Sequence, residues 1–225
     1  MASDSVREFY NRQYGSHIDG EAPCPHSLHD LAKAHRRVAR VFRGLNIDNC
    51  RPGAEVLDIG SGLGYYTKAL SSTGASVTGI DFSETAIALA RATFPGCRFL
   101  HAAWHEDVDS QARFDLIWAV NFSLVNTFDV DFINQHLVLE ALRRLKPNGS
   151  IVIGWNTDFS GRRILNYAHW SIGMLSHMRR VCGVSAPFVP EARTIWLSWI
   201  LMHAAALLRR SIPVFMVRQR RENVR

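Results

Sequence analysis

A ten-residue segment, Val56–Tyr65, combines an acidic residue with closely spaced glycines. Asp58 comes first, and glycines follow at every second position: Gly60, Gly62 and Gly64. Glycine is needed where the backbone takes a positive φ, or where a ligand lies against bare peptide. A second acid, Asp81, stands 23 residues after Asp58 at the end of the next apolar run. Because a carboxylate there can accept hydrogen bonds from both ribose hydroxyls of an adenosine, the pattern predicts a nucleoside-containing ligand.

Other phosphate- and nucleotide-binding patterns do not match this turn. The dinucleotide fingerprint G-x-G-x-x-G needs a glycine where the chain has Tyr65 or Thr67, and no lysine follows in P-loop register. An NAD(P)-dependent oxidoreductase is therefore disfavoured. A purely structural role for Asp81, as a loop acid capping a helix that starts at Ser83, stays open as the alternative.

Short apolar runs alternate with helical segments from Glu55 onward, and they form the scaffold that must position this turn. We expect strands at 55–60, 76–81, 97–103, 114–120 and 150–156, and helices at 27–45, 63–72, 83–94 and 131–145. The strand at 150–156 is apolar on both faces, as in a parallel sheet that helices cover on both sides. The predicted fold class is α/β, a doubly wound, mostly parallel sheet preceded by N-terminal helices.

Beyond Trp155 this alternation stops. We expect a helix over 159–181, a break at Pro187 and Pro190, a helix at 195–208 and a last strand over 212–221. No convincing sixth strand is found between these elements.

Four motifs together resemble the class I S-adenosylmethionine-dependent methyltransferases of small-molecule type, across about residues 50–156. They are the glycine turn, Gly79-Ile80-Asp81, Phe114-Asp115-Leu116-Ile117 and Leu145-Lys146-Pro147-Asn148-Gly149-Ser150. The resemblance implies a Rossmann-like fold and S-adenosyl-L-methionine as cofactor. It also implies that the turn holds the methionine and ribose portion, that Asp81 binds the ribose and that Phe82 packs on adenine. The implied turn residues are Asp58, Gly60, Ser61, Gly62 and Gly64.

One position departs from the family pattern. The family usually has an acid at the end of the third strand that meets the adenine amino group, whereas this chain has Ala103. Adenine recognition is then left to backbone groups or to Trp104, whose indole is able to stack on the ring. Ordinary core packing of Trp104 is an equally good interpretation.

Methyl transfer needs an acceptor atom held in line with the methyl group, and a general base only if that atom must lose a proton. Asn121, after the fourth strand, stands where this family often places acceptor-facing groups. His105, which leaves the third strand, is the first candidate base, with an exposed loop histidine as the alternative. Weaker candidates are His26, His29 and His169.

Tyr10 and Tyr14 resemble the aromatic N-terminal segment that closes over the cofactor in many small-molecule methyltransferases. Packing of these tyrosines on the sheet edge is the alternative. The chain 1–225 then forms a single methyltransferase domain, with an N-terminal helical lid at 1–49, a cofactor-binding core at 50–156 and acceptor-side helices with the last strand at 157–225.

The C-terminal third carries nearly all of the positive charge. The chain has a net charge of +6, but residues 159–225 contain 11 arginines and only two acids, which gives +9, and the first 158 residues sum to −3. Residues 195–202 are apolar all round a helix and must be covered by protein, partner or apolar ligand. For 195–221 three interpretations stay open: an acceptor-binding cap, a homodimer contact, or a peripheral membrane or lipid contact.

Composition limits the class of protein and the compartment that we expect. At 225 residues, 47% of them hydrophobic and 20% charged, the chain buries a real core and is neither disordered nor fibrous. Four cysteines form no C-x-x-C pair, so we expect a reducing compartment and no metal centre. The first 20 residues have no apolar signal region and no run of 18 apolar residues exists, so we expect a cytoplasmic protein, peripheral at a membrane if anywhere.

These observations predict an enzyme, an S-adenosylmethionine-dependent methyltransferase acting on O or N of a small-molecule, sugar or lipid-like acceptor. An RNA methyltransferase is the rival among enzymes. Nucleic acid is an unlikely partner, because the N-P-P-Y type signature is missing and Pro23-Cys24 precedes the cofactor turn instead of following it. A non-catalytic S-adenosylmethionine-binding module is the alternative from another class.

Overall fold

The computed structural model describes residues 8, 11, 12, 14, 30–106, 108–164 and 167–221. Of the residues discussed above, Tyr10, Cys24, His26 and His29 lie outside these ranges. No helix within the described ranges has the length and apolar character needed to cross a bilayer.

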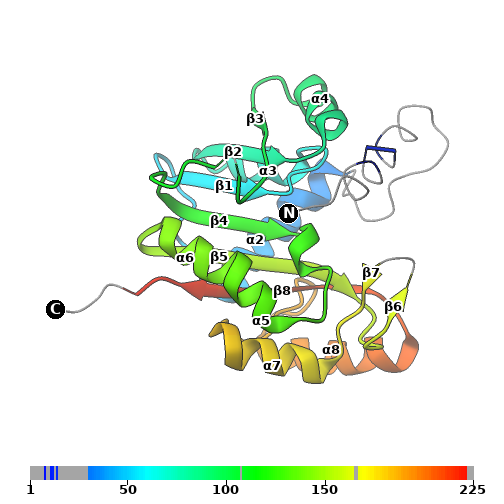
Figure 1. Cartoon of the computed structure of the whole chain (residues 1–225). Coiled ribbons are helices and arrows are strands. Elements are labelled where there is room, and N and C mark those ends of the chain that lie inside the picture. Colours follow the sequence, from blue (N-terminus) through cyan, green and yellow to red (C-terminus); the bar gives the residue numbers. More distant parts are fainter. Residues whose placement is uncertain are drawn as a thin grey trace.

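A six-stranded sheet in the order β3-β2-β1-β4-β5-β8 forms the centre of the molecule (Figure 1). Its strands are β1 (Glu55–Ile59), β2 (Ser76–Asp81), β3 (Arg98–His101), β4 (Phe114–Val120), β5 (Leu145–Thr157) and β8 (Ile212–Gln219). All neighbours are parallel except β5 and β8, which are antiparallel. The predicted α/β class and mostly parallel sheet are confirmed.

Helices cover both faces of the sheet, and alternate strand residues belong to different cores. The helices α2 (Leu31–Leu45) and α3 (Tyr65–Ser71) pack on the face that carries Val56 and Trp118. The opposite face, with Leu57 and Ile117, is covered by α5 (Val130–Ile133), η2 (Asn134–Leu139), α6 (Glu140–Arg144) and α7 (Ile172–Cys182). This period of two places successive side chains of each strand in the two cores.

Capping residues mark the N-terminal ends of two helices. Ser83 accepts a hydrogen bond from the Ala86 N–H and begins α4 (Glu84–Thr93), as its type predicts. Asp30 caps α2 in the same way, so this helix begins at Leu31, and 27–29 of the predicted 27–45 helix lie outside the described residues. A short 3₁₀ turn, η1 (Ser123–Val125), follows β4.

The predicted helix over 159–181 is wrong in its first half. Phe159 and Gly161 take positive φ angles of 62° and 68°, which interrupt a right-handed helix. The chain instead forms a small hairpin, β6 (Arg163–Ile164) with β7 (Tyr167–Ala168), outside the main sheet. Helix α7 begins only at Ile172, after the N-cap Ser171. In the described part of the segment between β5 and β8, the main sheet gains no further strand, as expected.

The C-terminal third packs helices and a loop around the β8 edge. Helix α8 (Ile195–Leu208) begins at the N-cap Thr194 and buries Met202 and Ala205. The segment 185–188 runs along the outer side of β8, with Ser185 N–H donating to the Val217 carbonyl at 2.7 Å and Phe188 exchanging two backbone bonds with Phe215. The sheet edge at β8 is therefore covered by the chain's own backbone.

Candidate functional site

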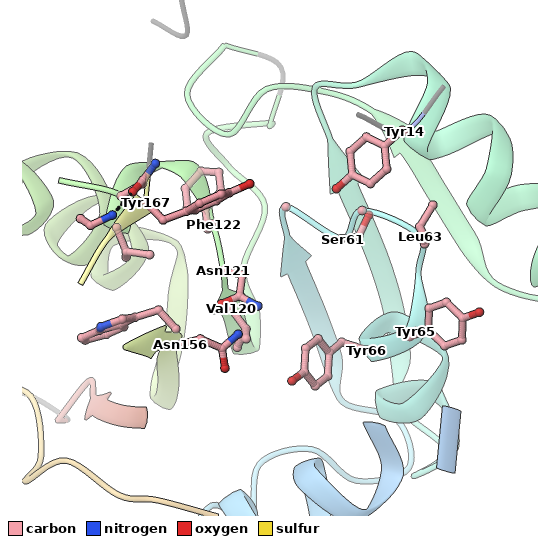
Figure 2. Close-up of a pocket in the computed structure, with 16 residues that line it drawn as sticks. Tyr14, Ser61, Leu63, Tyr65, Tyr66, Val120, Asn121, Phe122, Asn156 and Tyr167 are labelled. Carbon is pink, nitrogen blue, oxygen red and sulfur yellow. Dashed lines mark hydrogen bonds between the residues drawn. The ribbon is translucent and has the colours of Figure 1, made fainter. Parts of the chain in front are cut away.

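A cavity lies at the carboxyl ends of β1, β4 and β5, where the strand order reverses between β1 and β4. Ligands bind at such reversal points in doubly wound sheets. Its empty space, open mouth included, is about 870 Å³. In Figure 2 the labelled side chains form two facing groups, Tyr14, Ser61 and Tyr66 on one side and Asn121, Phe122 and Asn156 on the other.

The glycine turn after β1 forms one wall of this cavity. Gly60, Gly62 and Gly64 all have positive φ, so the turn takes the backbone shape that their spacing predicts. The N–H groups of Gly60 and Ser61 both donate to the Ile80 carbonyl at 2.9 Å, which fixes the turn to β2. The Ser61 Oγ is buried and has no hydrogen-bond partner among the described residues. A buried hydroxyl without a partner beside bare backbone suits a polar ligand.

Asp81, at the end of β2, ties the glycine turn to the start of α4. Its Oδ2 accepts the Gly62 N–H at 3.0 Å and its Oδ1 accepts the Ser83 N–H at 2.9 Å. The side chain is buried, and this burial raises the pKa of the carboxyl although both bonds oppose the shift. Each carboxylate oxygen has a second lone pair for a ligand hydroxyl. Asp81 is not itself a wall residue of the cavity, so its ribose contact stays a prediction.

Asp58 does not reach the cavity and serves the fold from beneath the turn. Its Oδ2 accepts the hydroxyl of Thr67, on α3, at 2.6 Å. Burial raises the pKa of Asp58 to about 7, the Thr67 hydrogen bond opposes this shift, and the nearby Asp81 carboxylate adds to it. We therefore assign Asp58 to holding β1 and α3 together, and not to direct ligand contact.

Replacing Asp58 by asparagine is expected to change how stability depends on pH. Between the unfolded pKa of 3.8 and the folded pKa of about 7, the folded state holds a proton that the unfolded state has released. The bound proton stabilises the folded state, and this stabilisation is lost as pH rises through the folded pKa. The free energy of unfolding should therefore fall by about 2 kcal/mol between pH 5 and 7. Asparagine still accepts the Thr67 hydroxyl and does not ionise, so Asp58→Asn should remove this loss.

Urea unfolding of both proteins across this pH range measures the difference. The exposed Asp109 gives the matched control, Asp109→Asn, whose pH slope should equal that of the wild type. Parallel pH slopes for wild type and Asp58→Asn would contradict the assignment.

Two described N-terminal residues lie over the glycine turn. Tyr14 is buried against Leu63 and Ala86, and its hydroxyl lies 2.8 Å from the position that a Cβ on Gly62 would take. Asn11 accepts the Ser83 hydroxyl at 2.6 Å. These contacts place Asn11 and Tyr14 where a lid would lie, and the lid function itself stays a prediction.

Asn121 lies on the opposite wall, at the end of β4. Its φ is 55°, in the left-handed region that a residue other than glycine rarely adopts, and its N–H donates to the Gly154 carbonyl at 2.8 Å. Such backbone strain is concentrated at functional sites. Asn126 and Asn156 line the same wall, and the Asn126 Oδ1 is held by the Ala168 N–H at 2.6 Å.

The cavity wall is uncharged. All 16 described residues that line it are aromatic, aliphatic, glycine, alanine, serine or asparagine. Tyr66, whose hydroxyl accepts a bond from Arg37 at 3.0 Å, has its pKa raised by burial and stays protonated at neutral pH. The wall therefore presents amide and hydroxyl groups within an aromatic surround.

Comparisons with known proteins agree with this geometry. A model of the methyltransferase domain family matches residues 56–149. The demethylmenaquinone methyltransferase of Tropheryma whipplei (strain Twist) is 37% identical over 128 residues, covering 55% of this chain and 48% of that protein. The ubiquinone biosynthesis O-methyltransferase of Bradyrhizobium diazoefficiens is 33% identical over 131 residues, covering 53% and 46%. The chain thus spans about half the length of these relatives.

A solved structure shares the fold over nearly the whole chain. The N-methyltransferase NodS from Bradyrhizobium japonicum WM9, in complex with S-adenosyl-L-homocysteine, has a TM-score of 0.63 at 14% identity and covers 96% of this chain and 98% of its own. Residues 56–149 match the methyltransferase domain family, and the chain as a whole shares the fold of this N-methyltransferase structure. The cofactor of this family is the one predicted from the glycine turn, and the open backbone and the Ser61 hydroxyl of the turn fit it.

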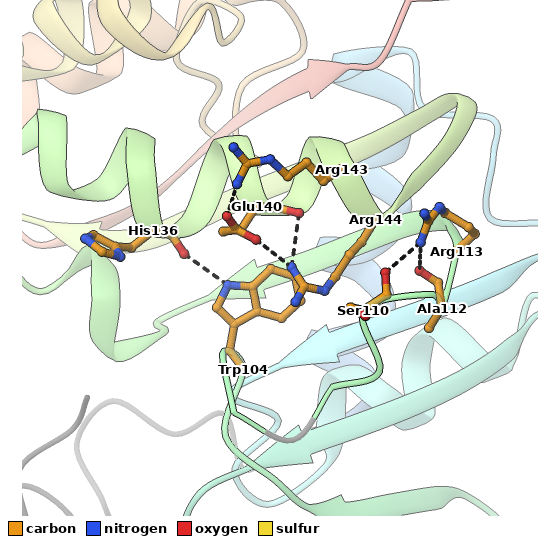
Figure 3. Close-up of polar contacts among 8 residues, drawn as sticks. All are labelled: Trp104, Ser110, Ala112, Arg113, His136, Glu140, Arg143 and Arg144. Atoms are coloured by element: carbon orange, nitrogen blue, oxygen red, sulfur yellow. Dashed lines mark hydrogen bonds and ion pairs between the residues drawn. The ribbon is translucent and has the colours of Figure 1, made fainter.

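Trp104 does not line the cavity, so the predicted stacking on adenine is not supported. Its ring is 3% exposed, and its Nε1 donates to the His136 carbonyl at 3.1 Å (Figure 3). The Arg144 guanidinium lies over the ring at 4.9 Å, held in turn by Glu140. His136 belongs to η2, a π-helical turn of the rare kind that appears as a single turn within an α-helix. Core packing is the interpretation that the geometry favours.

His105 and Phe82 are also absent from the cavity wall. His105 is exposed and contacts the rings of Trp104 and His136. Partial burial, with the neighbouring His136, lowers its pKa. Phe82 is partly exposed beyond Asp81, and its carbonyl lies 3.0 Å from the His101 Nε2. The base role of His105 and the adenine contact of Phe82 therefore gain no support from position.

His169, a weaker candidate base, lies next to the cavity. It follows the wall residues Tyr167 and Ala168, and its Nδ1 is 3.2 Å from the Asp158 Oδ1 and accepts the Asp158 N–H at 3.2 Å. Both side chains are nearly buried. Burial raises the pKa of Asp158, but hydrogen bonds from Ser160 and the electrostatic effect of the nearby His169 ring outweigh burial and lower it.

Sequence reasoning missed the wall that β5 and the β6–β7 hairpin supply. Trp155 and Asn156 fall at the end of a strand predicted only as core, and Tyr167 falls in a segment predicted as helix. The Trp155 Nε1 is buried without a hydrogen-bond partner among the described residues. The available signal was topological, because β5 is parallel to β4 and its end must lie beside Asn121.

Proposed function

We propose that this methyltransferase transfers a methyl group from S-adenosyl-L-methionine to an oxygen or nitrogen of a neutral small molecule with an aromatic or lipid-like body. The observation that carries the proposal is the uncharged, aromatic wall that connects the glycine turn to Asn121. A charged acceptor would lack a partner on that wall, and burying an unpaired charge is costly. The names of both sequence relatives concern quinones, which supports a small-molecule acceptor.

The glycine turn and Asp81 are the groups proposed to hold the cofactor. Gly60, Ser61, Gly62 and Leu63 line the cavity, and the Asp81 carboxylate is proposed to accept the ribose hydroxyls. Tyr14, whose hydroxyl lies against Gly62, is proposed to exclude water, which would strengthen polar contacts inside. When bound, S-adenosyl-L-methionine supplies a methyl group activated by its sulfonium.

Asn121 is proposed to orient the acceptor atom. Its amide offers both a donor and an acceptor, so it suits a hydroxyl or an amine. Most of the rate of such a transfer comes from positioning the acceptor atom. A side chain carried on a strained, fixed backbone is useful for this purpose. Where the acceptor must lose a proton, His169, which contacts Asp158 and directly follows the wall residues Tyr167 and Ala168 in the chain, replaces His105 as our candidate base.

Asn121→Gly is expected to reduce turnover without harming the fold. Glycine adopts the φ of 55° more readily than asparagine, so the melting temperature should stay level or rise. Loss of the amide should reduce kcat/KM for the acceptor about 10- to 100-fold, by one or two hydrogen bonds, with an unchanged Kd for S-adenosyl-L-methionine. Release of S-adenosylhomocysteine with a panel of neutral phenols, catechols and amines is the measurement.

Asn148→Gly is the matched control, because Asn148 has a φ of 61° at an exposed position of β5 and does not line the cavity. Its turnover should equal that of the wild type. If the wild-type protein binds S-adenosyl-L-methionine but methylates no member of the panel, the proposed acceptor class is wrong, and the non-catalytic binding module becomes the better interpretation.

A further inference from the structure

Helix α8 leaves one apolar face uncovered by the described part of the chain. Trp196, Ile200 and Leu207 recur at helical spacing and are 70%, 46% and 86% exposed, and Leu208 beside them is 67% exposed. We call these four residues the α8 stripe; Ile195, His203 and Ala204 complete the exposed surface of the helix. The opposite face of the helix is buried through Met202 and Ala205. Large apolar side chains exposed together mark an interaction surface.

Arginines surround the α8 stripe. Arg193 precedes the helix, and Arg209 and Arg210 follow it, all exposed. Arg179 and Arg180, at the end of α7, line a shallow groove together with Trp199 of α8. Residues 172–221 hold eight arginines and one acid, Glu191. In Figure 1 both helices lie on the side of the molecule opposite α4.

We infer that α8 docks this protein onto the surface of an anionic phospholipid bilayer. The stripe would enter the boundary between headgroups and acyl chains, and the arginines at both ends of the helix would meet lipid phosphates. Apolar and aromatic side chains flanked by basic residues are the features of interfacial helices. The inference concerns a surface separate from the cavity, so it holds whichever acceptor is methylated.

Charge argues against a second copy of the chain as the occupant. A twofold dimer through α8 would bring the arginine clusters of both copies against each other, which like charges disfavour. A stable dimer also uses about 20–30 residues on each side, whereas the α8 stripe has four. An anionic bilayer complements both the apolar face and its rim.

Co-sedimentation of the full chain with vesicles tests the inference. We expect binding to vesicles of phosphatidylcholine with about one third phosphatidylglycerol, and weak binding to phosphatidylcholine alone, because each basic residue adds about fivefold near an anionic surface. The double variant Arg209→Gln/Arg210→Gln should bind about 30-fold more weakly. Leu207→Glu should lose at least tenfold by removing apolar contact and adding a negative charge.

Leu100→Glu is the matched control, since Leu100 is 40% exposed on β3, away from α8. It should bind vesicles like the wild type, and circular dichroism of every variant checks that the fold is kept. Absence of binding to the anionic vesicles would overturn the inference. So would a dimer in sedimentation equilibrium that Leu207→Glu dissolves, or binding to an RNA oligonucleotide that is tighter than binding to the anionic vesicles.

Discussion

Asp81→Ala is expected to weaken the binding of S-adenosyl-L-methionine by at least 100-fold. The carboxylate is proposed to accept two ribose hydroxyls, and each charge-assisted hydrogen bond contributes about 1.5–3 kcal/mol. The substitution also leaves the N–H groups of Gly62 and Ser83 without their present acceptor, which loosens the turn. Both effects act in the same direction on the Kd, which isothermal titration calorimetry measures.

A second ligand separates the two effects. The 2′-deoxy analogue of S-adenosylhomocysteine lacks one of the hydroxyls in question, so the wild type should bind it at least tenfold more weakly than S-adenosylhomocysteine itself. Asp81→Ala should bind both ligands equally. Asp109→Ala, which removes an exposed carboxylate that accepts the Gln111 N–H, is the control and should bind like the wild type. A variant at Asp81 that still discriminates the two ligands would show that the ribose is recognised elsewhere.

Gly64→Ala is expected to reduce the free energy of unfolding by about 2–5 kcal/mol. A left-handed φ of 83° costs a residue with a Cβ about 1–2 kcal/mol. The added Cβ would also stand 2.5 Å from the Phe99 ring and 3.2 Å from the Ala90 Cβ, and overpacking of this kind costs about 1–3 kcal/mol. The contact lies between α3, α4 and β3, so no flexible side chain is available to move aside.

Substitutions at two other glycines separate the conformational cost from the packing cost. Gly53 has a φ of 80° and nothing within 4 Å of its added Cβ, so Gly53→Ala should show the conformational cost alone. Gly96 has neither the positive φ nor a close neighbour, and Gly96→Ala should be neutral. Chemical denaturation of the three variants gives the series. Equal stability of the variants at Gly53 and Gly64 would remove the packing explanation.

Local pattern was sufficient to predict one half of the site. The glycine turn, the place of Asp81 at the end of β2 and the place of Asn121 at the end of β4 all follow from short runs with definite spacing. These features depend on backbone shape and strand order, which residue type controls directly. The S-adenosylmethionine-dependent family follows from the same motifs.

The other half depends on packing between distant segments, which one sequence does not reveal. Trp104 follows β3 just as a cofactor-stacking residue would, but the carbonyl of His136 and the guanidinium of Arg144 hold its ring in the core. The segment after β5 is apolar enough for a helix, yet the left-handed Phe159 turns it into a hairpin that completes the cavity. Asp58 has the same type as Asp81, and only its depth beneath the turn separates their roles.

The backbone cover of β8 limits how the molecule can associate. Ser185 and Phe188 already take up hydrogen-bonding groups on the outer side of β8, so this edge cannot recruit a strand from another chain along that stretch. Self-association by strand addition, and the aggregation that often follows from it, is therefore blocked at the end of the sheet that carries the most charge. Any assembly through the C-terminal third must use side-chain surfaces, and its strength will then respond to salt and to single surface substitutions.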